Sequence, residues 1–238
     1  MKNNKMYIIG IIAIIGIILS IINIMSNHNK EINALDLEKA EKVLKKVEMP
    51  INSKYYGYYY DNKKVTAKDL DDKKIIMLGI NNILNESEEY LDNISKESLK
   101  KSVDSIFMNT KYKDQSINVG NCFGQIAKYS NNNYNISGDC HEGSREQYIT
   151  KIVKIKETKK KLIIKEKVIF VVYSSKDKNN IIQTIYKNKD KKKKIAKIKS
   201  DDSLILTKSN KYLKKGYTYK YVFLKKNNNY YFDYVQKD

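Results

Sequence analysis

The sequence predicts an α+β protein in which an N-terminal transmembrane helix precedes helices packed on a curved antiparallel β-sheet. Three observations support this prediction. Residues 6–25 form an uncharged apolar run, segments between residues 34 and 108 have helical periodicity, and segments of the second half alternate with the two-residue period of strands. Helices followed by consecutive strands are the order expected of an α+β layer fold.

The apolar run MYIIGIIAIIGIILSIINIM, residues 6–25, has the length of a membrane-spanning helix. About 20 helical residues cross the roughly 30 Å hydrocarbon core of a bilayer. Lys2 and Lys5 precede the run, so the positive-inside rule places residues 1–5 in the cytoplasm and the rest of the chain outside. No small-x-small cleavage step follows, which favours an uncleaved, single-pass signal anchor in the cell membrane. Gly16 and Ser20 have the spacing of a helix-pairing motif.

Residues 26–33 form a short polar linker, and residues 34–238 are long enough to bury the core of one extracytoplasmic α+β domain. A first helix is expected over residues 34–48, ended by Pro50, with an apolar stripe made of Leu35, Leu37, Val43, Leu44 and Val47. The tyrosine-rich segment around Gly57 is expected to be extended.

Two further helices are expected before the strands begin. Thr66 and Asp69 have the spacing of a capping box, which predicts a helix over residues 67–84. A second helix is expected over residues 96–108, with one apolar face made of Leu99, Val103, Ile106 and Phe107.

The predicted strands occupy the last hundred residues. Residues 147–157 and 162–173 are rich in β-branched and aromatic residues, and a charged turn from Thr158 to Lys161 joins them. Alternate positions of the second segment are apolar except Glu166, which interrupts that face. Shorter strands are expected over residues 181–187 and 195–199, and the chain closes with a hairpin of residues 217–225 and 230–236.

The chain is strongly basic, with 46 Lys and Arg residues, 27 Asp and Glu residues and a formal net charge of +19. Only Arg145 is an arginine, and the abundant Lys, Asn, Ile and Tyr all have A/T-rich codons, so base composition explains most of the surplus. Two lysine runs are candidates for contact with an anionic cell-wall polymer: Lys159, Lys160, Lys161, Lys191, Lys192, Lys193 and Lys194. Nucleic acid is not an expected partner of a domain outside the membrane.

The two cysteines, Cys122 and Cys140, fit a disulfide in an extracytoplasmic domain. Free cysteines are the alternative to this bridge. The competing function is a hydrolase or thiol enzyme that uses the loop from Cys122 to Glu142, which also holds Asp139 and His141. Known hydrolase motifs and phosphate-binding glycine loops are missing from the sequence. We therefore predict no catalytic residue, no metal site and no cofactor.

A tyrosine cluster is the candidate binding surface of the chain, because tyrosine combines an apolar ring with a polar tip. Its members are Tyr55, Tyr56, Tyr58, Tyr59 and Tyr60. Packing of these rings into the core or the sheet is the alternative interpretation.

Several segments together resemble an uncharacterised family of membrane-anchored proteins of low-GC Gram-positive bacteria. These segments are the signal anchor, VTAKDLDDKKIIMLGINNI, SLKKSVDSIF before a cysteine-containing loop, and the closing TYKYVFLKKNNNYYFDYVQK. The order of helices and curved sheet is also similar to cystatin-like and NTF2-like domains, which implies a binding or accessory role. The predicted function is a membrane-anchored binding module rather than an enzyme, with a structural subunit of a membrane complex as a further alternative. Another envelope protein is therefore also a candidate partner, and the sequence does not determine an oligomeric state.

Overall fold

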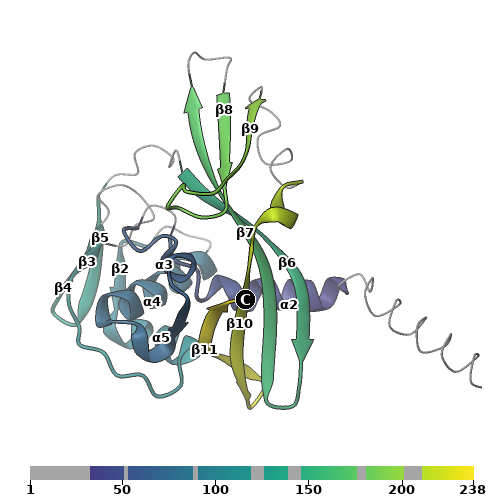
Figure 1. Cartoon of the computed structure of the whole chain (residues 1–238). Helices are drawn as coiled ribbons and strands as arrows, with labels where there is room; N and C mark the ends of the chain where they lie inside the picture. Colours follow the sequence, from purple (N-terminus) through teal and green to yellow (C-terminus); the bar gives the residue numbers. More distant parts are fainter. Residues whose placement is uncertain are drawn as a thin grey trace, which may run out of the picture. The chain divides into compact units, whose positions relative to one another are not determined.

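A computed structural model of the chain describes residues 33–50, 53–87, 91–118, 126–138, 146–175, 181–200 and 211–238. Within these residues the chain is α+β, with helices and antiparallel sheets (Figure 1). The predicted anchor, residues 6–25, lies outside them. Among the helices of the described part, none has both the length and the apolar character that a bilayer crossing requires.

The main sheet is built on one long hairpin, in which β6 (Glu146–Glu157) pairs with β7 (Lys161–Ser175). The other edge of β7 is shared, because β10 (Tyr217–Lys226) pairs with its first half and β8 (Ile181–Tyr186) with its second half. β11 (Asn229–Lys237) and β1 (Lys64–Thr66) extend the first branch, and β9 (Lys194–Ser200) extends the second (Figure 1). The sheet is curved, and all the longer strands predicted from the two-residue period are confirmed.

The two faces of the sheet are covered by different parts of the chain. Leu162, Ile164 and Phe170 of β7 belong to the main core, whereas Ile169 and Val171 belong to a smaller apolar cluster with Leu213. Leu213 lies in the short 3-10 helix η3 (Leu213–Lys215). This alternation is what a strand buried on both faces requires.

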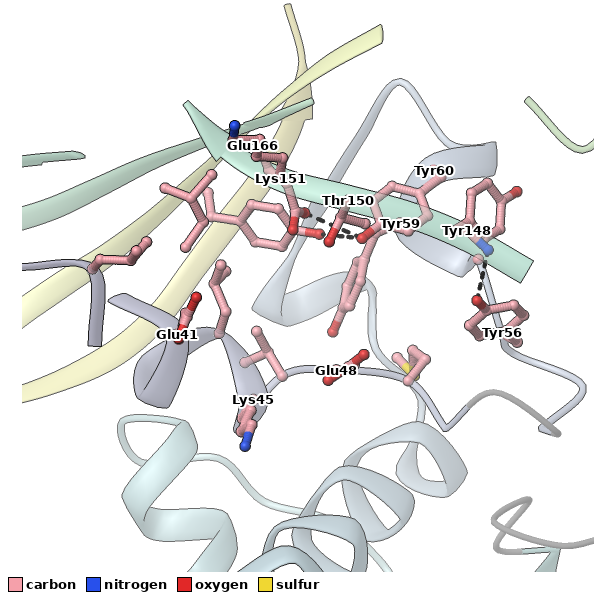
Figure 2. A pocket seen from close by; sticks show the side chains of 17 residues that line it. Glu41, Lys45, Glu48, Tyr56, Tyr59, Tyr60, Tyr148, Thr150, Lys151 and Glu166 are labelled. Carbon is pink, nitrogen blue, oxygen red and sulfur yellow. Dashed lines mark hydrogen bonds between the residues drawn. The ribbon is translucent and has the colours of Figure 1, made fainter. Parts of the chain in front are cut away.

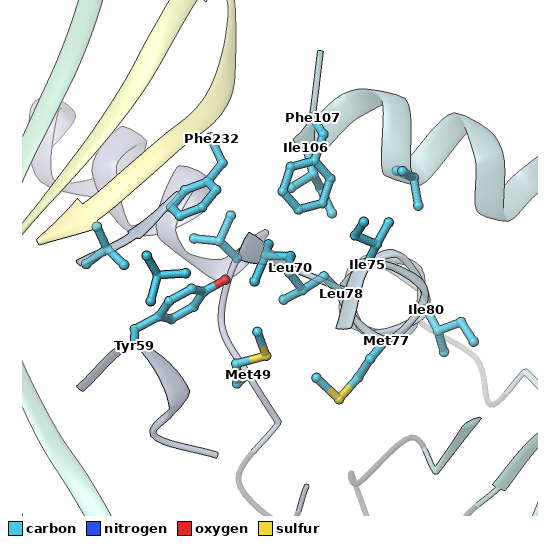
Figure 3. Packing of buried hydrophobic residues seen from close by; sticks show 14 of the residues in the cluster. Met49, Tyr59, Leu70, Ile75, Met77, Leu78, Ile80, Ile106, Phe107 and Phe232 are labelled. Atoms are coloured by element: carbon cyan, nitrogen blue, oxygen red, sulfur yellow. The ribbon is translucent and has the colours of Figure 1, made fainter. Parts of the chain in front are cut away.

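Two helices supply most of the main core that is not sheet. α4 (Asp72–Glu86) and α5 (Lys96–Ile106) pack closely because Gly79 has no side chain. A Cβ at Gly79 would lie 2.6 Å from Leu99 Cδ1 and 2.7 Å from Val103 Cγ2. Figure 3 shows Ile106 and Phe107, at the end of α5, beside Phe232 of β11, whose ring centroid lies 6.2 Å from that of Phe107.

The predicted helix over residues 67–84 begins later than expected. The capping box of Thr66 and Asp69 is present, but the helix that it begins is only the 3-10 helix η1 (Ala67–Asp69). Asp71 then caps α4 by accepting a hydrogen bond from the Lys74 amide at 2.9 Å. The two capping residues, Thr66 and Asp71, lie five residues apart. Leu70 between them has an extended backbone, so η1 and α4 are separate helices.

The extended conformation predicted for the tyrosine-rich segment is wrong. Residues 53–57 form successive turns, and Tyr58–Asp61 form the one-turn helix α3. Gly57 takes a left-handed conformation, with φ of 83°, that other residues adopt at a cost. The left-handed Gly57 and α3 together bring the rings of Tyr56 and Tyr60 against Tyr148 of β6, with centroids 5.5 and 4.6 Å away.

The first helix is confirmed as α2 (Ala34–Lys45), three residues shorter than predicted. Its buried face contains Ala40 and Val43, whereas Leu35 is 73% exposed and does not belong to the apolar stripe. Val47 and Met49 follow the helix and are buried in the main core.

A second sheet was not predicted. β2 (Asn93–Ser95), β5 (Asn133–Ser137), β4 (Ile126–Ser130) and β3 (Ile117–Asn118) pair in that order. Asn131 and Asn132 both have positive φ and form the tight turn between β4 and β5. Strands of two to five residues are too short to show a clear period in the sequence.

Candidate functional site

A cavity of about 460 Å³ lies between α2, the segment that follows it and the main sheet (Figure 2). α2 contributes Leu37, Glu41, Leu44 and Lys45; the next segment contributes Val47, Glu48 and Met49, then Tyr56, Gly57, Tyr59 and Tyr60; and the sheet contributes Tyr148, Thr150, Lys151, Ile152, Glu166 and Tyr221. The lining is apolar and aromatic with a few polar groups, which is typical of small-molecule sites.

The tyrosine turn forms one wall of the cavity, and close packing holds it there. A Cβ on Gly57 would lie 2.4 Å from Cε2 of the Tyr148 ring, so only glycine allows this approach. The hydroxyl of Tyr56 accepts a hydrogen bond from the Tyr148 amide at 2.7 Å. The ring of Tyr148 also lies 4.6 Å, centroid to centroid, from the ring of Tyr60.

Glu166 is the buried acid of the cavity, with 6% of its surface exposed. Its Oε2 accepts a hydrogen bond from the Tyr60 hydroxyl at 3.2 Å, and its carboxylate also accepts one from the side chain of Thr150. Burial raises the pKa of Glu166 to about 7, although the two hydrogen bonds oppose the shift. Glu166 therefore changes charge near neutral pH.

A row of hydroxyl groups leads to this carboxylate. Tyr221 donates to the Tyr60 hydroxyl at 3.3 Å, and Tyr60 donates to Glu166. Tyr219 fixes the backbone of the turn by donating to the carbonyl oxygen of Tyr60 at 2.7 Å. Burial raises the pKa of both Tyr60 and Tyr221 well above the ordinary value, so both hydroxyls stay protonated and donate.

Glu48 is a second acid of the cavity. Its side chain is reached by solvent at the open side, but the surrounding protein removes part of its hydration and raises its pKa. Lys45 opposes this effect, and the charge of Glu48 contributes to the raised pKa of Glu166. The backbone carbonyl of Glu48 accepts a hydrogen bond from Asn81 of α4 at 3.2 Å, which ties this segment to the helical layer.

The five tyrosines of the predicted binding surface divide into two groups. Tyr56, Tyr59 and Tyr60 line the cavity. The rings of Tyr55 and Tyr58 instead face the Lys74 ammonium, whose Nζ lies 4.7 and 4.6 Å from their centroids. This ammonium also lies 2.5 Å from Oδ2 of Asp71. One turn therefore combines tyrosines that line a cavity with tyrosines that pack against the rest of the fold.

The two predicted lysine runs lie at different places along the main sheet, one at the β6–β7 turn and the other at the β8–β9 connection. Lys159 and Lys160 are exposed in the β6–β7 turn, beside Lys161 at the start of β7. Tyr186, the last residue of β8, pairs with Phe170 of β7, which lies nine residues from Lys161. The connection that leads to Lys191–Lys194 therefore begins beside Phe170. At about 3.3 Å per residue the runs are roughly 30 Å apart and do not form one patch.

The predicted disulfide and the alternative thiol site fall on Cys122, Cys140 and the residues between Asp139 and Glu142, all outside the described part of the chain. In the described residues no group of His, Cys, Asp or Glu side chains is placed to hold a metal ion.

Sequence reasoning missed Glu48, Glu166, Tyr148 and Tyr221 as residues of a site. The signal was present for Glu166, since a single acid interrupts an otherwise apolar strand face. The other three residues come together only through the fold.

No family model, curated protein or solved structure matches this chain. The likeness to membrane-anchored proteins of low-GC Gram-positive bacteria stays a prediction.

Proposed function

We propose that this protein is a binding module whose cavity beneath α2 holds a small ligand, and that residues 6–25 anchor it in the cell membrane. The observation that supports binding most is the cavity of about 460 Å³ with a buried carboxylate among apolar and aromatic side chains. Burying a carboxylate is costly, and apolar residues of similar size would stabilise the fold more. A ligand-binding role accounts for that cost.

The proposed site is tested by filling the cavity. Ile152→Trp introduces a large ring from a lining residue of β6 and is expected to abolish ligand binding. Val153→Trp is the matched control, because Val153 is its neighbour, is 43% exposed and does not line the cavity. A fragment library screened by ligand-observed NMR should give hits that bind the natural protein and the control but not Ile152→Trp. Hits that bind all three proteins equally would refute the cavity as the site.

The proposed location outside the cytoplasm rests on the uncharged run of residues 6–25 and on Lys2 and Lys5 before it. Protease added to intact protoplasts is expected to degrade the domain. Complete protection, with degradation only after lysis, would contradict this orientation. The alternative of a thiol enzyme predicts a reactive free thiol, and mass spectrometry that finds Cys122 joined to Cys140 would exclude it.

An anionic envelope polymer is a second candidate ligand, favoured by the exposure of the lysines in both β-turns. Because the runs are roughly 30 Å apart along β7, only an extended chain would contact both. Retention on a teichoic-acid-like polyanion should fall with salt and with neutralisation of either run. Retention that changes neither with salt nor with neutralisation of the lysines would exclude this partner.

A further inference from the structure

Glu166 is not neutralised by the lysines beside it in the strand. Lys165 and Lys167 alternate to the other face of β7, where Lys165 Nζ lies 2.5 Å from Asp238 Oδ2 and Lys167 donates to the Gly216 carbonyl at 3.3 Å. None of the ion pairs found among the described residues includes Glu166. Among those residues, the only lysines that line the cavity are Lys45 and Lys151, and both are exposed.

The carboxylate also keeps unused hydrogen-bonding capacity. A carboxylate has about four lone-pair sites. Glu166 uses two of them, for Tyr60 and Thr150, and it lines the cavity. A ligand that donates hydrogen bonds and carries positive charge would complete its coordination.

The chain itself contains the arrangement that such a ligand would form. The Lys74 ammonium lies against the carboxylate of Asp71 and the rings of Tyr55 and Tyr58. An ammonium is attracted to a carboxylate by charge and to aromatic faces by the ring quadrupole. The cavity also combines a carboxylate with tyrosine side chains (Figure 2). There the Tyr60 hydroxyl donates to Glu166, which has no ammonium partner among the described residues.

We propose that the cavity binds a protonated organic amine with an apolar body, the ammonium at Glu166 and the body against Leu44, Val47 and Ile152. This inference rests on the proposed function of the cavity as a ligand site. Glu41 and Glu48 add negative charge to the lining, whereas Lys45 and Lys151 oppose it at the solvent side. The ligand class is therefore defined by one positive charge next to an aromatic or aliphatic group.

The binding of such an amine depends on pH. The titratable and charged groups that line the cavity with Glu166 are Tyr60 of α3, Tyr221 of β10, Tyr148 and Lys151 of β6, Glu41 and Lys45 of α2, and Tyr56, Tyr59 and Glu48 of the segment after α2. Of these, Glu48 raises the pKa of Glu166, and a bound ammonium lowers it. Amine affinity should therefore rise as the pH increases through about 7 and then level off, since aliphatic amines stay protonated up to about pH 10.

Isothermal titration of the full chain in detergent, against detergent alone, tests the inference with three probes of similar shape. These are 2-phenylethylamine, 2-phenylethanol and 3-phenylpropionate, each at pH 8. The amine should bind at least tenfold more tightly than the alcohol, and the carboxylate should bind least. Glu166→Gln should weaken amine binding about 10- to 100-fold, because a charge-assisted hydrogen bond is lost. Glu97→Gln, on the exposed face of α5, should leave binding unchanged.

The outcomes separate this inference from the proposed function. In one outcome the alcohol or the carboxylate binds as tightly as the amine, Glu166→Gln does not change this binding, and Ile152→Trp abolishes it. That outcome would overturn the amine inference and keep the cavity as a ligand site. Binding of no probe to the natural protein would overturn the amine inference, whereas amine binding that persists in Ile152→Trp would overturn both the inference and the cavity as a ligand site. Chemical denaturation of each variant confirms that it is folded.

Discussion

Replacing Glu166 by glutamine should make the folded protein more stable at neutral and higher pH. Burial raises the pKa of Glu166 from an ordinary 4.5 to about 7. Below pH 4.5 the group is protonated in both the folded and the unfolded protein and contributes nothing to the pH dependence. Between pH 4.5 and about 7 the unfolded chain ionises first, so the free energy of unfolding decreases as the pH rises. Above about pH 7 the cost is constant.

The size of this effect follows from the same pKa values. Each factor of ten in proton affinity is worth about 1.4 kcal/mol, so the shift from 4.5 to about 7 corresponds to about 3 kcal/mol. Glutamine carries no charge, and its side-chain oxygen still accepts from Tyr60. We therefore expect Glu166→Gln to be more stable than the natural protein by about 2–3 kcal/mol at pH 8, and close to equal at pH 4.5.

Urea denaturation of both proteins across pH 4.5–8 measures this difference, because other titrating groups cancel between them. Glu97→Gln, an exposed change of the same chemistry, should give a difference close to zero throughout. A Glu166→Gln difference that stays flat with pH, or that grows towards acid, would refute the reasoning about the buried carboxyl.

Three further changes test other parts of the structure. Gly216→Ala should destabilise by more than about 2 kcal/mol in urea melts, because its Cβ would lie 2.2 Å from the Val168 carbonyl oxygen; a neutral effect would contradict that contact. Lys225, Lys39 and Tyr230 donate hydrogen bonds to Glu157 and lower its pKa to about 2, so the free energy of unfolding should fall as the pH drops from 4.5 towards 2. Glu157→Gln should reduce this loss of stability in acid, and the same pH dependence in both proteins would argue against the network. Tyr60→Phe removes the donor to Glu166 and should cost about 1–3 kcal/mol at pH 8 while raising the Glu166 pKa further, as a titration of both proteins would show.

The long strands were predictable because an alternation of apolar and polar residues over many positions is typical of a strand with one buried face. β6, β7, β10 and β11 each extend over nine or more residues. Alternate residues are buried in the first half of β7, from Leu162 to Val168, and in β10, from Tyr219 to Phe223. The second sheet, by contrast, depends on pairing between distant short segments such as β2 and β5, whose register no local pattern indicates. The sequence therefore predicted the long strands and not the short ones.

The tyrosine turn shows how tertiary context can override local propensity. Tyrosine favours strands, and five of them in six residues predicted an extended segment. The left-handed Gly57 and its contact with the Tyr148 ring, 91 residues later in the chain, produce a turn instead. The cavity depends on that contact, so its residues could not be assembled from sequence spacing. Glu166 was visible only as an exception to a pattern.

A direct measurement of the Glu166 carboxyl tests the central claim most closely. Side-chain ¹³C NMR of the full chain, with the signal assigned from its loss in Glu166→Gln, gives the pKa with and without 2-phenylethylamine. We expect a midpoint of about 7 in the free protein and a clearly lower midpoint at saturating amine. A midpoint near 4.5 in the free protein, or one that the amine does not move, would contradict a buried carboxylate that recognises an ammonium group.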